Sequence, residues 1–255
     1  MTEPRFETTE NAFLGGALRL RQPKSGHRAG HDAMLLAAAT SARSGDRVVD
    51  FGAGVGAAGL ALAARNPGVQ IVLVEIDDRL AELARGNAAS NALKAEVIAM
   101  DVASGAEVFA GAGLPPDSVD VVLMNPPFND SRRHRPSPDK SREVAHGADA
   151  ATLGNWVQAA RRILKSGGVL TLIWRADEVG EVLAALERGF GSLAILPVHG
   201  DPATPAIRVL IRAVKAGRAP TQIFAGLMLN DAPGVPNKRV QEILAGKGNL
   251  PLAML

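Results

Sequence analysis

From Arg47 onward the chain alternates between short apolar runs and segments of helix-forming composition, and this alternation limits the fold more than any other feature. Strands that alternate with helices are typical of an α/β fold, in which helices cover a parallel sheet. The apolar runs predict strands at 46–51, 70–75, 95–100, 118–124, 168–174, 192–198 and 206–214. The segments between them predict helices at 56–66, 77–91, 150–165 and 177–188. We therefore expect an α/β fold with a parallel sheet at its centre.

The segment before this region is expected to cap it. Residues 1–30 are polar and rich in glycine, and an alternating run at 17–22 fits a strand or one arm of a hairpin. Asp32 is placed to cap a helix over 33–42, because its side-chain oxygen can accept from the first free amides of that helix. Asp77 lies at the start of the helix predicted at 77–91, where a carboxylate suits the positive end of the helix.

The alternation fades after Pro220, where glycine, proline and asparagine recur. One short helix fits residues 236–245. We therefore divide the chain into an N-terminal cap segment (1–30), a central domain (31–215) and a C-terminal tail (216–255).

Charge and cysteine content exclude several classes of protein. The chain has 28 lysine and arginine residues against 26 aspartate and glutamate residues, and its formal charge of +2 permits a nucleic-acid partner without requiring one. It has no cysteine, which excludes disulfides, thiolate metal sites and a cysteine nucleophile. The acidic first ten residues do not resemble a secretory signal, and no apolar run approaches the roughly 18 residues needed to cross a bilayer. We therefore expect a soluble, cytoplasmic protein.

A glycine-rich turn, Gly52-Ala53-Gly54-Val55-Gly56, joins the first strand of the alternating region to its first helix. The glycines at 52, 54 and 56 let the backbone pass close to a ligand. Glu75 ends the next strand, where its carboxylate can accept from both ribose hydroxyls of an adenosine. A plain strand–helix turn could contain the same glycines, so the flanking strand, the helix and Glu75 carry the functional interpretation.

Asp50 discriminates between two adenosine-containing ligands that such a turn can bind. A dinucleotide brings a negative pyrophosphate, which a carboxylate two residues before the first glycine would repel. The ammonium of a methionine moiety would be attracted instead. Asp50 therefore favours an S-adenosylmethionine site, although Gly52, Gly54 and Ala57 also satisfy the dinucleotide spacing.

The expected strand at 118–124 ends abruptly in Asn125-Pro126-Pro127-Phe128. The two prolines have no N–H to donate, so the strand stops and turns there. The Asn125 amide oxygen and the neighbouring carbonyls are acceptors of the kind that a planar NH2 group needs. Phe128 offers an aromatic face for stacking. A strand-ending turn with a core phenylalanine is the alternative interpretation.

These motifs together resemble those of the class I S-adenosylmethionine-dependent methyltransferases. The resemblance rests on Asp50–Gly56, on Val74-Glu75-Ile76-Asp77 and on Met100-Asp101-Val102. It implies a Rossmann-like, seven-stranded, mostly parallel sheet flanked by helices, with S-adenosyl-L-methionine as cofactor. It also implies that Glu75 holds the ribose and that Ile76 lies against the adenine. Asp101 would accept from the adenine amine, with Val102 beside it.

The Asn-Pro-Pro-Phe motif is similar to that of the amine-methylating branch, and residues 10–215 resemble the bacterial valine-tRNA adenine-N6 methyltransferases. The likeness includes Gln22–Leu36, a segment that borders the cofactor pocket in that group and contains Arg28. It implies that the Asn125 side chain and the Pro126 carbonyl accept the two N–H groups of the target amine, while Phe128 holds the base. The implied cofactor-binding residues are Arg28, Asp50, Gly52, Gly54, Gly56, Glu75, Ile76, Asp101, Val102 and Asn125.

Arg132, Arg133 and Arg135 lie in a basic loop that follows this motif. We expect this loop, with Pro127, to contact an RNA substrate, with tRNA as the first choice, and a solvated surface loop is the alternative. A protein glutamine amide presents the same NH2 group, but the short segment before the first helix lacks the helical substrate domain usual in those enzymes. A small-molecule methyltransferase and a catalytically silent binding module stay open. No metal site is expected.

Overall fold

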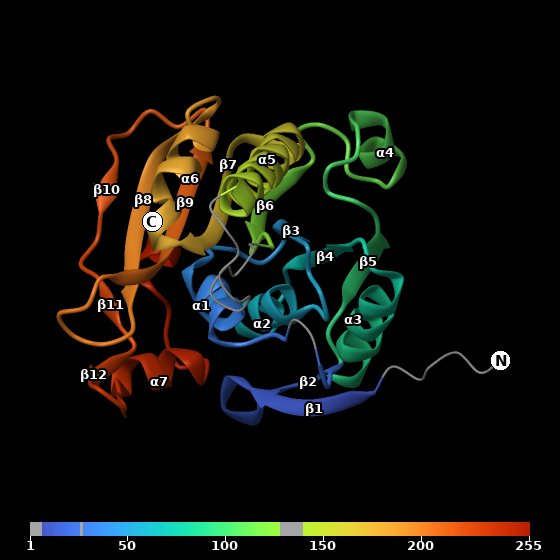
Figure 1. Cartoon of the computed structure of the whole chain (residues 1–255). Helices are drawn as coiled ribbons and strands as arrows, with labels where there is room; N and C mark the ends of the chain where they lie inside the picture. The colour runs from blue at the N-terminus through green and yellow to red at the C-terminus, as the bar shows by residue number, and fades with distance from the viewer. Residues whose placement is uncertain (1–6, 26–27, 128–139) are drawn as a thin grey trace.

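The computed structural model describes residues 7–25, 28–127 and 140–255, and a large mixed sheet runs through its centre (Figure 1). Seven strands follow one another in the order β8-β9-β7-β6-β3-β4-β5. They are β3 (Arg47–Phe51), β4 (Gln70–Glu75), β5 (Ala95–Ala99), β6 (Val119–Met124), β7 (Leu164–Arg175), β8 (Phe190–His199) and β9 (Ala206–Lys215). The strands from β7 to β5 are parallel, whereas β9 runs antiparallel to β7 and to β8. The expected α/β fold with a mostly parallel sheet is confirmed.

Two short strands extend the sheet beyond the seven that the sequence predicts. β10 (Gln222–Ile223) and β11 (Leu227–Met228) both pair with β8 in parallel. Each has only two residues, too few for an apolar pattern to mark them in the sequence.

Helices cover both faces of the sheet, which explains why its strands are apolar on both sides. One face carries α1 (His31–Ala39), α2 (Ala57–Arg65), α3 (Asp78–Ser90) and α7 (Lys238–Leu244). The other carries α4 (Ala106–Gly111), α5 (Lys140–Ile163) and α6 (Val179–Leu186). Along β3, Val48 packs with the first group while Val49 and Phe51 pack with the second.

An N-terminal hairpin lies against α3, beside the helical layer that holds α1 and α2 (Figure 1). Its arms are β1 (Thr8–Phe13) and β2 (Leu18–Pro23), paired antiparallel. The predicted strand at 17–22 is therefore one arm of a hairpin. Leu18 and Leu20 alternate with exposed arginines along β2 and are fully buried in the core shared with α1 and α2.

The predicted cap of the first helix is wrong. α1 begins at His31 after Gly30, and Asp32 lies inside its first turn. The Asp32 carboxylate is occupied elsewhere, since Oδ2 accepts from Nε of Arg208 on β9 at 3.0 Å. The helix also ends at Ala39 and not near 42, because Thr40 adopts an extended backbone.

Asp77 caps its helix as its position predicts. The carboxylate accepts from the backbone N–H groups of Arg79 (2.8 Å) and Leu80 (3.4 Å) at the start of α3. Among the other helices, α5 begins ten residues earlier than the predicted 150, at Lys140, and the six-residue α4 is not predicted at all.

The C-terminal segment folds back onto α1 and α2. It forms a small hairpin, β12 (Asn230–Ala232) with β13 (Val235–Pro236), and then α7, which confirms the short helix predicted there. Arg65 at the end of α2 donates to the carbonyls of Ile243 and Gly248 and to the Asn249 side chain. Within the described ranges, none of the helices is long and apolar enough to span a membrane.

Candidate active site

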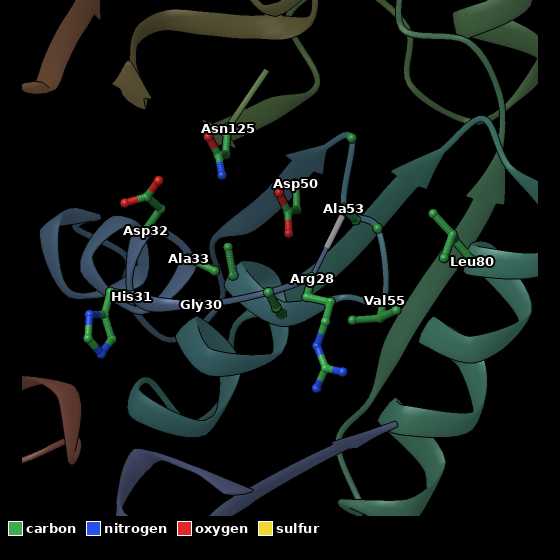
Figure 2. Close-up of a pocket in the computed structure, with 15 residues that line it drawn as sticks. Arg28, Gly30, His31, Asp32, Ala33, Asp50, Ala53, Val55, Leu80 and Asn125 are labelled. Atoms are coloured by element: carbon green, nitrogen blue, oxygen red, sulfur yellow. The ribbon is translucent and has the colours of Figure 1, made fainter. Parts of the chain in front are cut away.

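A cleft opens at the carboxyl ends of β3 and β6, the adjacent strands where the direction of the strand order reverses. Ligands bind at such switch points because the loops that follow the two strands diverge and leave room between them. Figure 2 shows Asp50 and Asn125 reaching toward this cleft from neighbouring strands, with α1 on one side. Five of the predicted site residues line it: Arg28, Asp50, Gly52, Gly54 and Asn125.

The glycine-rich turn adopts a backbone that favours glycine at all three positions. The φ angles are 63° at Gly52, 56° at Gly54 and 85° at Gly56, in the left-handed region that residues with a Cβ rarely adopt. A Cβ on Gly52 would lie 2.3 Å from the Trp156 ring, whereas a Cβ on Gly54 would meet open space. Gly52 therefore permits close packing with α5. At Gly54, the absence of a side chain leaves the backbone accessible where it faces the cleft.

Asp50 is a buried carboxylate at the end of β3. Only 2% of its surface is exposed, and Oδ2 accepts from the Gly59 backbone N–H in α2 at 2.8 Å. Burial raises the pKa of Asp50 to about 7, and the nearby Glu75 carboxylate adds to this rise. Burial disfavours the charged form of this carboxylate, and a ligand ammonium that pairs with it would stabilise that form.

Glu75 fixes the glycine-rich turn from the end of β4. Its Oε2 accepts from the Gly54 N–H at 2.7 Å and its Oε1 accepts from the Asp77 N–H at 2.9 Å. The next residue, Ile76, leaves 65% of its surface exposed, although it is a large apolar side chain. An exposed isoleucine beside an anchored carboxylate suits a ligand with a flat apolar face and a hydroxylated ring.

Asp101 and Val102 follow β5, one strand further from the cleft. Asp101 is exposed, and its Oδ1 accepts from the Ala103 N–H at 2.8 Å, while Val102 is buried. Together with Glu75, Ile76 and Gly56, these two residues lie outside the lining of the cleft. They lie along the same edge of the sheet, because β3, β4 and β5 are parallel.

Asn125 follows β6 directly and completes the other side of the site. Its Oδ1 is buried, and among the residues that the structure describes it has no hydrogen-bond partner. Pro126 is buried behind it and Pro127 is exposed. The remaining predicted residues, Phe128, Arg132, Arg133 and Arg135, lie outside the described residues.

The first turn of α1 also lines the cleft, although Asp32 was predicted only to cap that helix. His31 and Asp32 both line it, and Asp32 is held by the ion pair with Arg208. Figure 2 shows Asp32 on the side of the cleft next to Asn125, with the His31 ring directed away from Asn125. The sequence carried one signal for this, since Asp32 lies in the segment with Arg28 that resembles a pocket border.

Comparison with known proteins identifies a family model described as the methyltransferase small domain, which matches residues 28–199. The chain is 32% identical over 166 residues to the tRNA1(Val) (adenine(37)-N6)-methyltransferase of Bacteroides thetaiotaomicron. That match covers 64% of this chain and 65% of the relative, slightly less than two thirds of its length. The protein of the same name from Flavobacterium psychrophilum is 29% identical over 194 residues, covering 75% of this chain and 80% of the relative.

Solved structures show the same architecture. A crystal structure described as a predicted O-methyltransferase of Agrobacterium tumefaciens is 33% identical, with a TM-score of 0.72, and the match covers 86% of this chain and 98% of that one. The Thermus thermophilus 16S rRNA N2 G1207 methyltransferase, solved with AdoMet and guanosine, is 23% identical with a TM-score of 0.56. That match covers 82% of this chain and 50% of the other, and it supports the shared fold alone.

Proposed function

This chain belongs to the methyltransferase small domain family and uses S-adenosyl-L-methionine as methyl donor, and from this premise we propose that it methylates the N6 amine of an adenine in RNA. tRNA is the first candidate, because the relatives from Bacteroides and Flavobacterium are named for a tRNA adenine-N6 reaction. The proposal concerns the acceptor, which family membership leaves open.

The observation that carries this proposal is the side chain of Asn125, a residue that lines the cleft and whose buried Oδ1 has no hydrogen-bond partner among the described residues. A buried acceptor without a partner costs roughly 1–3 kcal/mol, so such an atom is expected to receive a hydrogen bond from a ligand. An exocyclic amine has two N–H groups, of which Asn125 can accept one and the Pro126 carbonyl the other. Two acceptors on one amine draw its lone pair out of the ring and stabilise the positive charge that grows during methyl transfer.

The methyl donor is assigned to side chains at the carboxyl ends of β3 and β4, inside the cleft and next to it. When bound, S-adenosyl-L-methionine supplies an electrophilic methyl group on a sulfonium. We assign the Asp50 carboxylate to its ammonium, Glu75 to its ribose hydroxyls and Ile76 to its adenine. The bare backbone at Gly54 leaves room for the ligand to lie close to the turn. These residues orient the donor toward Asn125, and orientation of this kind contributes several kcal/mol to a two-substrate reaction.

The RNA part of the proposal rests on the relatives and on the basic loop. Arg132, Arg133 and Arg135 stand a few residues after Asn125 in the sequence, where they can meet phosphates beside the target base. Phe128 is assigned to stacking on that base, and Pro127 to the wall beside it. Other relatives are named for the methylation of ribosomal RNA. One of them is a Stutzerimonas stutzeri protein that is 36% identical over 85 residues.

A hydroxyl acceptor is the second candidate, because the Agrobacterium protein is described as a predicted O-methyltransferase. A hydroxyl has one hydrogen to donate, so it would satisfy one of the two acceptors at Asn125 and Pro126 and leave the other without a partner. The arrangement of acceptors therefore fits an amine better than a hydroxyl.

Incubation with S-adenosyl-L-methionine carrying a labelled methyl group, followed by separation of RNA, protein and small molecules from a cell extract, tests this proposal. We expect the label in the RNA fraction. Label in protein alone would indicate a glutamine-amide substrate, and label in small molecules alone would indicate a metabolite; either result would overturn the RNA proposal.

A further inference from the structure

Two buried amide side chains, Asn87 and Gln22, tie the N-terminal hairpin to two segments that line the cleft, one at Val55 and one at Ala29. We propose that they are positioning residues for S-adenosyl-L-methionine, acting through the backbone that the cofactor contacts. This inference rests on the assignment of the cleft as the cofactor site, and it concerns two residues that the sequence analysis does not assign to cofactor binding. Asn87 is 1% exposed and Gln22 is 2% exposed, so water does not replace their hydrogen bonds.

Asn87 joins three elements through one amide group. Its Oδ1 accepts from the Arg21 N–H on β2 at 2.8 Å, and its Nδ2 donates to the Arg21 carbonyl at 3.0 Å. The second hydrogen of Nδ2 goes to the carbonyl of Val55, in the glycine-rich turn, at 2.9 Å. Because this amide donates to two carbonyls and accepts from one N–H, its orientation is fixed. Asn87 therefore holds the turn at a set distance from β2.

Gln22 makes the corresponding link to the second segment, at Ala29. Its Oε1 accepts from the Ala29 N–H at 2.9 Å, and its Nε2 donates to Oδ1 of Asn11 on β1 at 3.0 Å. The same Asn11 oxygen accepts from Nη2 of Arg28 at 2.8 Å. Ala29 and Arg28 both line the cleft.

The two links start from consecutive residues of one strand. Arg21 bonds with Asn87 through its backbone, and Gln22 is the next residue, so β2 holds the turn at Val55 and the segment at Ala29 in a fixed relation. Figure 1 shows the hairpin lying across this side of the molecule, next to α3. A cleft whose two lining segments are already spaced for the cofactor avoids the cost of ordering them on binding.

Asn91 provides a matched control. It lies one turn after Asn87, at the C-cap of α3, and makes the same kind of contact with β2, accepting from the Arg19 N–H at 2.9 Å and donating to the Arg19 carbonyl at 2.7 Å. Among the described residues it makes no hydrogen bond to the glycine-rich turn or to Ala29, and its other bonds go to Asn87 and Ser90 of α3. Asn91 therefore anchors the hairpin without a hydrogen bond to either segment.

The test measures the dissociation constant of S-adenosyl-L-methionine by calorimetry for the unmodified chain and for Asn87→Ala, Gln22→Met and Asn91→Ala. We expect Asn87→Ala and Gln22→Met each to raise the dissociation constant about tenfold, because each removes one hydrogen bond to a segment that lines the cleft, an effect of roughly 1.4 kcal/mol. Asn91→Ala is expected to lower the melting temperature and leave the dissociation constant within about twofold. Gln22→Met keeps the volume of the side chain, so the test survives if Asn87→Ala does not fold.

Amide hydrogen exchange of the cofactor-free protein gives a second readout that does not depend on turnover. The amides of residues 53–56 should exchange faster in Asn87→Ala than in Asn91→Ala at equal distance from the melting temperature. Unchanged cofactor affinity in both Asn87→Ala and Gln22→Met would overturn the positioning role, as would an equal loss of affinity in Asn91→Ala. Absence of binding by the unmodified chain would instead overturn the cofactor assignment itself.

Discussion

At the scale of single residues, Asn125 carries the chemistry that we assign to the cleft. Its Oδ1 is buried and has no hydrogen-bond partner within the described part of the chain. Asn125→Ala should therefore lower kcat by about 10²- to 10³-fold, the usual loss when one preorganised polar contact to the developing charge is removed. The dissociation constant of S-adenosyl-L-methionine, measured in parallel, should change little. A variant with full activity would rule out the mechanism.

Asp50 predicts a pH dependence of cofactor binding. Its pKa of about 7 exceeds the ordinary value of 3.8, so the folded chain keeps this proton to higher pH than the unfolded chain does. The stability that this retained proton contributes is present below pH 3.8 and is lost as the pH rises through 7. An ammonium pairs with the ionised form alone, so binding below pH 7 must release the proton.

Affinity for S-adenosyl-L-methionine should consequently rise about tenfold between pH 5.5 and 7.0, a range in which an α-amino group near pKa 7.7–8.0 stays charged. Calorimetry across this range measures the trend. Asp50→Asn should bind more weakly at pH 7 and show a flat profile over the same range. A flat profile in the unmodified chain would show that Asp50 does not face the ammonium.

At the scale of elements, two glycines of the glycine-rich turn have different tasks: Gly52 allows packing against α5, and Gly54 leaves space for a ligand. A methyl group on Gly52 would collide with Trp156, whereas one on Gly54 would project into open space at the cleft. Gly52→Ala should lower the free energy of unfolding by several kcal/mol, through overpacking together with a strained φ. Gly54→Ala should lower the free energy of unfolding by about 1 kcal/mol. Its loss of cofactor-binding free energy should be larger than this loss of stability. Thermal melts compared with dissociation constants check the contrast, which equal effects of both substitutions would contradict.

The sequence predicts the elements whose signal is local. Seven strands and the turn at Gly52–Gly56 could be found because apolar runs and glycine spacing are contiguous in the chain. Asp32 was misassigned because its partner, Arg208, lies on a strand formed much later in the chain. Asn87 gave no signal, and Gln22 stood out only as the first residue of the segment expected to border the pocket, because a buried amide is identified by partners that only the fold brings together.

At the scale of the whole molecule, the C-terminal segment completes the core on the α1 face. Val240, Ile243, Leu250 and Leu252 are all buried there, and the Leu250 N–H donates to the Ala38 carbonyl at 2.9 Å. Burial of each such side chain contributes roughly 1.5–3 kcal/mol, so their combined loss approaches the total stability of a typical domain, about 5–15 kcal/mol.

Deletion of residues 238–255 should therefore abolish cooperative unfolding, as followed by circular dichroism during heating. Arg65→Met, which removes only the guanidinium contacts between α2 and this segment, should melt cooperatively at a lower temperature than the unmodified chain. A deletion variant that melts as sharply as the full chain would show that residues up to 237 fold alone, and would favour the division at residue 215 predicted from the sequence.

The proposed reaction requires that an amine enters the cleft beside Asn125. The direct measurement is nucleoside analysis by mass spectrometry of tRNA incubated with the protein and S-adenosyl-L-methionine, with Asn125→Ala as the paired control. We expect N6-methyladenosine in the tRNA treated with the unmodified chain, and far less in the tRNA treated with the variant. Methylated product that appears equally with Asn125→Ala, or methylation on a ribose or other hydroxyl in place of the adenine amine, would contradict it.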